Sequence, residues 1–134
     1  MTNIYLDIDG VLLTKRKNKP DHVLDLVEFL TSNFKCFWLT THCRNGENGA
    51  VKYLSGFYNQ EEIRFFERIA PAYWIDLKTE GIDFNISFIW LEDYPLESEI
   101  RILMEKGRLN SLITVNLERI NELQNVLQEI KRII

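Results

Sequence analysis

The sequence lacks any long hydrophobic run. No apolar stretch approaches the roughly 20 residues that a membrane-spanning helix needs. The first residues also lack the basic segment, long apolar stretch and small residues that together form a secretory signal. We therefore expect a cytoplasmic protein that does not bind membranes.

Cysteine and histidine are scarce, with two residues of each in 134. Cys36 and Cys43 form neither a CxxC pair nor the dense framework of a disulfide-rich domain, so we expect two free thiols. His22 and His42 lack the spacing of metal ligands, which argues against a histidine-ligated zinc site. His42 lies close to the end of a predicted strand, so it could contact a substrate or simply lie at the surface.

The chain has no excess of positive charge. A net charge of −4 and a pI near 5.2 give no electrostatic indication of nucleic acid or anionic lipid as a general partner. One local exception is a basic cluster made of Lys15, Arg16, Lys17 and Lys19. So short a run is typical of a solvated turn, but it could also form a binding patch.

What is present is an alternation of short apolar runs with longer stretches of helical period. This alternation predicts an α/β fold, a three-layer α/β/α sandwich with a parallel, Rossmann-like sheet of about five strands, in one domain over residues 1–134. The predicted strands lie at residues 4–8, 36–39, 73–75, 86–91 and 112–115. The predicted helices begin near residue 20, 50, 61 and 97, and the last has an apolar stripe of Ile120, Leu123, Leu127 and Ile130.

Two aspartates follow the first predicted strand. Asp7 and Asp9 are two residues apart, and because side chains alternate along a strand we expect both to point to the same side. Two nearby carboxylates repel each other, so a cation is needed to keep both ionised. Mg²⁺ suits such a site because it prefers oxygen ligands. The pair before Gly10 could instead be a simple turn.

Other polar residues follow the later strands. Thr40 and Thr41 follow the second, Lys78 the third, and Glu92 and Asp93 the fourth. Ligands of open parallel sheets bind at the carboxyl ends of the strands, so these groups can converge. We expect Thr40 to donate a hydrogen bond to a phosphoryl group, Lys78 to neutralise its charge and Asp93 to complete the metal site.

These residues resemble four motifs of the haloacid dehalogenase superfamily, in that family's order. The run DIDGVL at residues 7–12 resembles the first motif, FWLT at 37–40 the second, Lys78 the third, and FIWLED at 88–93 the fourth. The resemblance covers about residues 4 to 94.

The resemblance implies a Mg²⁺-dependent phosphohydrolase acting on a phosphomonoester. Asp7 would be the nucleophile that forms an aspartyl phosphate, and Asp9 the general acid and base. The metal would be held by Asp7, by the backbone carbonyl of Asp9 and by Asp93. The spacing leaves little room for a cap domain. The resemblance then implies an open site, which in such relatives often goes with macromolecular phosphorylated substrates or with a lid from another subunit. Residues 12–19 would form a short flap.

Several alternatives stay open. Thr41 could replace Thr40, Glu92 could bind metal or remain solvated, and Lys78 could begin a surface helix. A receiver-like signalling module would instead be phosphorylated at the end of the third strand, where Asp76 is the candidate. A catalytically silent relative that binds proteins is the third possibility.

Overall fold

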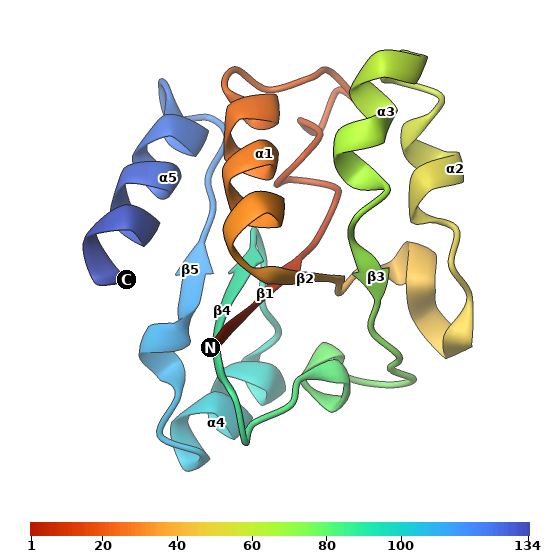
Figure 1. The fold of residues 1–134 in the computed structure, drawn as a ribbon. Coiled ribbons are helices and arrows are strands. Elements are labelled where there is room, and N and C mark those ends of the chain that lie inside the picture. The colour runs from red at the N-terminus through yellow and green to blue at the C-terminus, as the bar shows by residue number, and fades with distance from the viewer.

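A computed structural model describes all residues from 1 to 134 and contains one five-stranded sheet. All four strand pairs are parallel, and the order is β3-β2-β1-β4-β5 (Figure 1). The strands are β1 (Thr2–Leu6), β2 (Lys35–Trp38), β3 (Ala70–Pro71), β4 (Ser87–Glu92) and β5 (Leu112–Thr114). The parallel, Rossmann-like α/β fold predicted from the sequence is thus confirmed.

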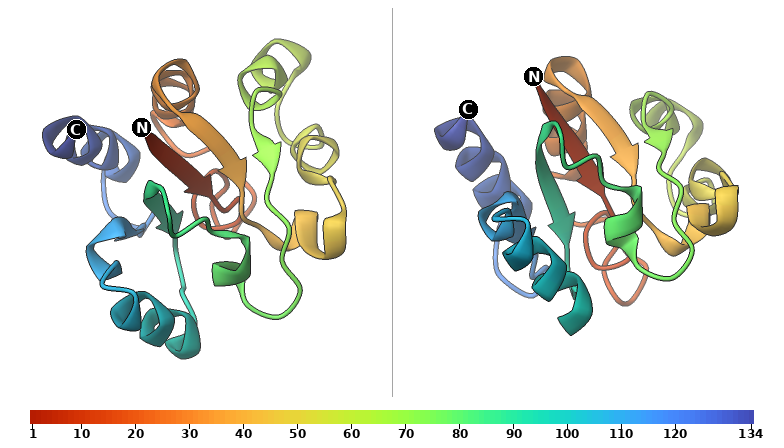
Figure 2. Two further views of the ribbon diagram at one scale, coloured as in Figure 1. Left: turned by 60° about the horizontal axis from the view of Figure 1, so that its bottom comes forward. Right: turned by 90° about the horizontal axis from the view of Figure 1, so that it is seen from below.

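Helices cover both faces of this sheet. The α-helices are α1 (Val23–Asn33), α2 (Ala50–Leu54), α3 (Gln60–Phe66), α4 (Glu97–Glu105) and α5 (Glu122–Ile133), and the short 3₁₀ helices are η1 (Thr41–Gly46), η2 (Lys78–Gly81) and η3 (Leu109–Ser111). Viewed along the sheet, α1, α3 and α5 lie on one face, and α4 and η2 lie on the other (Figure 2). None of the helices combines the length and the apolar character that crossing a membrane requires.

The alternation of side chains along β1 builds two separate cores. Ile4 and Leu6 point into the larger core, which packs against α1 and α5. Tyr5 points the other way, into a smaller core with Phe88 and Trp90 of β4. Because both faces of β1 are buried, its sequence reads as a continuous apolar run rather than an alternating one.

The third strand lies earlier in the chain than predicted. It consists of Ala70–Pro71, whereas residues 73–75 form no strand. Tyr73 and Ile75 are largely exposed, and the indole of Trp74 donates a hydrogen bond to the carbonyl of Thr40 at 3.1 Å. Trp74 therefore attaches a loop to the edge of the sheet, and the prediction of a strand at residues 73–75 was wrong.

Two helix starts also differ from the prediction. Ile120 is 87% exposed and precedes α5, whose buried stripe is Leu123, Val126 and Ile130. Helix α1 begins at Val23 rather than near residue 20, because His22 before it adopts a positive φ of 68°. In both cases the residue just before the helix has a left-handed backbone conformation, which fixes where the helix begins. The spacing of apolar residues does not reveal this.

Both cysteines are free and buried. Cys36 lies in β2 and Cys43 in η1. Burial raises the pKa of the Cys36 thiol to about 12, so this residue acts as a small apolar side chain.

Candidate active site

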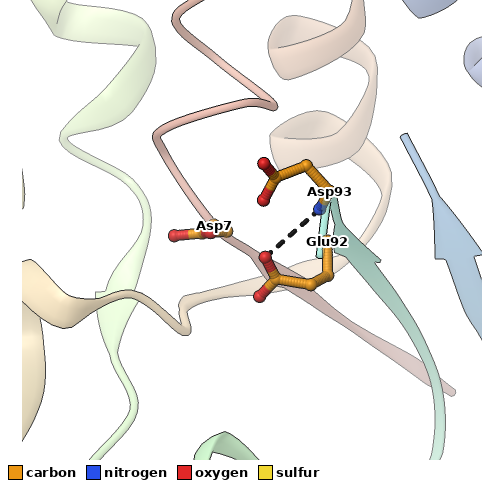
Figure 3. A group of neighbouring side chains, drawn as sticks. All are labelled: Asp7, Glu92 and Asp93. Carbon is orange, nitrogen blue, oxygen red and sulfur yellow. Dashed lines mark hydrogen bonds between the residues drawn. The ribbon is translucent and has the colours of Figure 1, made fainter. Parts of the chain in front are cut away.

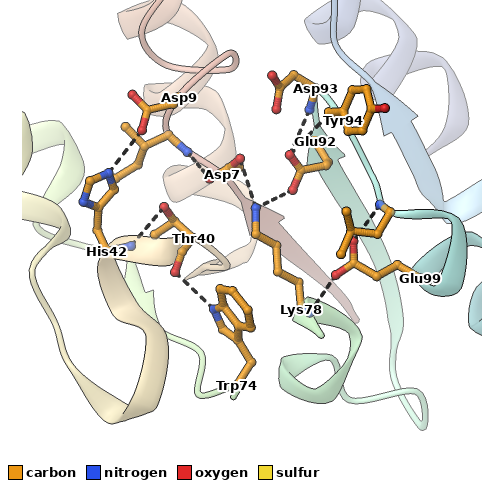
Figure 4. A network of polar contacts seen from close by, with 12 residues as sticks. Asp7, Asp9, Thr40, His42, Trp74, Lys78, Glu92, Asp93, Tyr94 and Glu99 are labelled. Atoms are coloured by element: carbon orange, nitrogen blue, oxygen red, sulfur yellow. Dashed lines mark hydrogen bonds and ion pairs between the residues drawn. The ribbon is translucent and has the colours of Figure 1, made fainter. Parts of the chain in front are cut away.

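The polar residues predicted to act together lie at the carboxyl ends of three neighbouring strands. Asp7 directly follows β1, Thr40 follows β2 two residues after its end, and β4 ends at Glu92. Because β1 lies between β2 and β4 in the sheet, these residues are brought to one edge (Figure 4). The sheet order, rather than sequence proximity, assembles the site.

Three carboxylates form the centre of this site. Asp7, Glu92 and Asp93 each offer an oxygen atom, and these atoms all lie within 4.8 Å of one another (Figure 3). Asp7 and Glu92 are buried, and Asp93 is partly exposed. The structure therefore places Glu92, whose role the sequence left open, in the same cluster as the predicted ligands Asp7 and Asp93.

Lys78 reaches this cluster from the start of η2. Its Nζ lies 3.1 Å from Oδ2 of Asp7 and 2.6 Å from Oε2 of Glu92. Burial alone disfavours the ammonium, but the charges of Asp7 and Glu92 outweigh it and raise the pKa of Lys78. The side chain of Lys78 is thus a buried, charged member of the site, not the surface residue of the alternative interpretation.

A buried glutamate holds Lys78 in place. The backbone N–H of Lys78 donates to Oε2 of Glu99 at 2.7 Å, and the N–H of Leu96 donates to Oε1 of the same carboxylate at 2.8 Å. Glu99 therefore ties the start of η2 to the start of α4. Nothing in the sequence distinguishes Glu99 from the exposed glutamates of α4.

The cluster carries more negative than positive charge. The triad has three carboxylates, and the one ammonium beside it, that of Lys78, pairs with Asp7 and Glu92. Burial and the neighbouring charge of Asp7 raise the pKa of Glu92 to about 9, while Lys78 only partly offsets them. Glu92 is 2% exposed, so water cannot relieve this repulsion. A bound cation can.

The carboxylate of Asp9 does not belong to this triad. Its oxygens instead accept hydrogen bonds from Lys17 at 2.6 Å and Tyr53 at 2.9 Å, and contact Nε2 of His42 at 3.2 Å. Burial works against the charge of Asp9, but these contacts outweigh it and lower the pKa of the carboxyl. The sequence predicted that Asp7 and Asp9 point to the same side from the end of a strand. In the structure β1 ends at Leu6, before both aspartates, and the carboxylate of Asp9 has partners that Asp7 does not share.

Tyr53 and Lys17 were not predicted as site residues. The helical spacing of the aromatic residues assigned Tyr53 to the core, yet its hydroxyl contacts Asp9 and its ring stacks on His42 with centroids 3.7 Å apart. These contacts depend on the path of η1 and the start of α2, which bring residues 42 and 53 together. His42 is therefore a neighbour of Asp9. This position is compatible with the interpretation in which His42 contacts a substrate.

Thr40, not Thr41, faces the interior of the site. Thr40 is buried, and its Oγ1 accepts a hydrogen bond from the N–H of His42 at 3.4 Å. No protein group accepts the hydroxyl proton of Thr40. Thr41 is exposed. Of the two threonines, Thr40 is thus the one able to donate to a ligand at the carboxyl edge.

Two features of the site require a glycine at position 10. It has a φ of 83°, which side chains with a Cβ rarely adopt. A Cβ at this position would lie 2.2 Å from Oδ2 of Asp93. Gly10 therefore permits the chain after β1 to pass against the carboxylate of Asp93.

Asp76, the candidate of the receiver-like alternative, is exposed on the loop before η2 and lies outside the acidic triad. No protein-family model matches this chain. No curated protein and no solved structure is significantly similar to it. Its function must therefore be inferred from the site itself.

Proposed function

We propose that this chain is a Mg²⁺-dependent phosphohydrolase of the haloacid dehalogenase superfamily that acts on phosphomonoesters through an aspartyl-phosphate intermediate. The observation that carries the proposal is the triad of Asp7, Glu92 and Asp93 at the carboxyl edge of a parallel sheet, with the ammonium of Lys78 paired to Asp7 and Glu92. Such an edge is where open α/β sheets bind their ligands.

The donor set fits Mg²⁺. The ion prefers oxygen ligands and is commonly held by one or two carboxylates together with substrate phosphate oxygens. Asp7 and Asp93 would hold it, with Glu92 as a further ligand or as the charge that keeps Lys78 in place. When bound, the ion would offset the negative charge of the carboxylates and of the phosphoryl oxygens. The raised pKa of Glu92 supports this fit, because burial and the charge of Asp7 make the carboxyl favour a proton, and a bound cation could take the place of that proton.

The contacts of Asp7 support its proposed role as the nucleophile. Its Oδ1 accepts a hydrogen bond from the N–H of Ile8 at 2.8 Å, which fixes the plane of the carboxylate. Its Oδ2 lies 3.1 Å from Nζ of Lys78. Attack of Asp7 on phosphorus forms the acyl phosphate and expels the leaving oxygen. Lys78 and the hydroxyl of Thr40 are the protein groups that stabilise the charge on the transferred phosphoryl group.

In this proposal Asp9 is the general acid and base. In the mechanism it protonates the leaving oxygen and later takes a proton from the water that hydrolyses the intermediate. The contacts from Lys17, His42 and Tyr53 position the carboxylate but favour its ionised form. A substrate phosphate that draws Lys17 away from Asp9 therefore raises the pKa of Asp9 and prepares it to act as an acid.

Assays with a general aryl phosphate test this function. We expect p-nitrophenyl phosphate to be hydrolysed in the presence of Mg²⁺ and not in EDTA. Asp7→Asn removes the nucleophile and abolishes turnover, whereas the matched variant Asp76→Asn changes an exposed aspartate and retains it. Metal-dependent turnover that survives in Asp7→Asn would overturn the proposal.

The wild-type protein and these two variants also distinguish the receiver-like module from the catalytically silent relative. Stable phosphorylation of Asp76, without release of phosphate, would indicate a receiver-like module. Folded wild-type protein that hydrolyses no phosphomonoester would indicate a silent, protein-binding relative.

A further inference from the structure

A groove of about 800 Å³ adjoins the acidic triad. Its walls come from the segment after Leu13 and from the loop between β5 and α5. The residues that matter for its chemistry are Lys15, Arg16, Asp93, Tyr94, Asn116 and Arg119. Only 3 of its 13 lining residues are hydrophobic, so its chemistry suits a polar ligand the size of a small molecule.

The groove is continuous with the proposed phosphoryl site. Asp93 belongs to the acidic triad and also lines the groove, and Gly10 forms part of the same wall. A phosphoryl group that lies against Asp7 and Asp93 can therefore extend its leaving group into the groove. This groove is thus located where the part of the substrate that is not transferred would lie.

The cations of the groove have no partners within the protein. Lys15, Arg16 and Arg119 line it, and none of them takes part in an ion pair or donates a side-chain hydrogen bond. In the same basic cluster Lys17 pairs with Asp9 at 2.6 Å, and Lys19 pairs with a glutamate at 3.0 Å. The cluster is therefore divided between cations that pair within the protein and cations that face the groove.

The charge balance of the groove favours an anion. Its acids are Asp93, which also belongs to the metal-binding triad, and Glu118. The groove also contains three unpaired cations, although the net charge of the protein is −4. Two of these cations are arginines, whose planar guanidinium binds two oxygens of one phosphate at the same time. The exposed ring of Tyr94 adds apolar surface along the same wall.

We propose that the groove binds the leaving group of the substrate and that this leaving group carries a second phosphate, so that the substrate class is a small bisphosphorylated molecule. This inference rests on the proposed function, since the first phosphate is the one transferred to Asp7. Arg16 and Arg119 bind the second phosphate from opposite walls, and Lys15 adds charge at the rim.

Binding of unreactive analogues tests the groove apart from catalysis. Calorimetry in Mg²⁺ compares alkane diphosphonates of three, four and six carbons with monophosphonates of the same length that end in a hydroxyl. We expect the best diphosphonate to bind at least about tenfold more tightly than its monophosphonate partner. Arg16→Gln with Arg119→Gln removes this preference, whereas Lys35→Gln, an exposed and unpaired lysine at the amino end of β2, retains it.

Turnover supplies the second readout. Wild-type protein is expected to hydrolyse alkanediol bisphosphates with a higher kcat/KM than the matching hydroxyalkyl phosphates. The Arg16→Gln and Arg119→Gln double variant loses that advantage, because its kcat/KM falls more for each bisphosphate than for the matching hydroxyalkyl phosphate. Equal binding and equal turnover of the mono- and bisphosphorylated members of every pair would overturn the inference.

The two proposals fail in different ways. If p-nitrophenyl phosphate is hydrolysed but no pair shows a preference, the groove inference is wrong and the phosphohydrolase stands. If no phosphate is released but diphosphonates bind through Arg16 and Arg119, the groove is a bisphosphate site and the proposed hydrolysis is wrong. A preference that persists in the double variant would also overturn the assignment of the groove.

Discussion

Replacing Glu92 by glutamine should change how the stability of the metal-free protein depends on pH. The pKa of Glu92 is raised from its ordinary 4.5 to about 9 in the folded protein, by burial and by the charge of Asp7. Between these two values the folded state holds a proton that the unfolded state has lost. Stability from this group is therefore complete below pH 4.5 and is lost as the pH rises towards about 9.

The size of the effect follows from the linkage between proton binding and folding. One group that is protonated only in the folded state lowers the free energy of unfolding by about 1.4 kcal/mol per pH unit. Between about pH 5 and about pH 7 the wild-type protein should thus lose about 3 kcal/mol that the Glu92→Gln variant does not lose. Glu92 is 2% exposed, so screening by solvent does not reduce this figure.

The slope is more informative than the stability at one pH. Oε2 of Glu92 accepts a hydrogen bond from Lys78 at 2.6 Å, and Oε1 lies 3.2 Å from the N–H of Asp93. The single oxygen of a glutamine cannot accept both, so the variant carries a fixed cost at every pH. That cost cancels when two pH values are compared.

Urea unfolding in EDTA at several pH values measures the slope. Glu105→Gln is the matched control, because Glu105 is exposed and has no ion pair, and its slope should equal that of the wild type. Added Mg²⁺ should stabilise the wild type more than Glu92→Gln, since a ligand of the folded state raises stability according to its affinity. Parallel pH profiles for wild type and Glu92→Gln would refute the account of an under-compensated acidic cluster.

Three further predictions concern the groups around this cluster. Gly10→Ala should lower stability by about 1–2 kcal/mol because residue 10 has a positive φ. The variant should also bind Mg²⁺ more weakly in calorimetry, because the added Cβ displaces Asp93. Unchanged affinity would contradict the geometry. Tyr53→Phe removes a hydrogen bond that lowers the pKa of Asp9, so the alkaline limb of the kcat/KM profile should move to higher pH, and a limb that stays in place would exclude Asp9 as the acid. Glu99→Gln leaves one of two buried N–H donors without an acceptor and should lower stability to urea by about 2 kcal/mol; a neutral effect would show that the carboxylate is dispensable.

Much of the fold followed from the sequence because its signals are local. The buried strands β1 and β4 read as continuous apolar runs. Asp7 directly follows β1, and β4 ends at Glu92. Parallel pairing then brings Asp7 and Asp93 to one edge. The third strand was misplaced because its two residues, Ala70 and Pro71, carry no strand signal, while Trp74 nearby is buried for another reason.

The surroundings of Asp9 could not be predicted in the same way. Tyr53 and His42 meet because two short helices turn the chain back over the sheet edge, and helical spacing alone assigns Tyr53 to the core. Likewise, the sequence shows one basic cluster but not which of its cations pair within the protein. Lys17 contacts Asp9, whereas Arg16 faces the groove. Contacts between loops decide both cases, and loops carry the weakest periodic signal.

Covalent labelling of Asp7 tests the central claim most directly. Turnover of a phosphomonoester in Mg²⁺ is stopped with acid, and the peptides are analysed by mass spectrometry for an added phosphoryl group. The account predicts a phosphoryl group on Asp7 that forms only with Mg²⁺ and disappears as substrate is exhausted. Phosphate release with no label on Asp7, or a lasting label on Asp76, would contradict it.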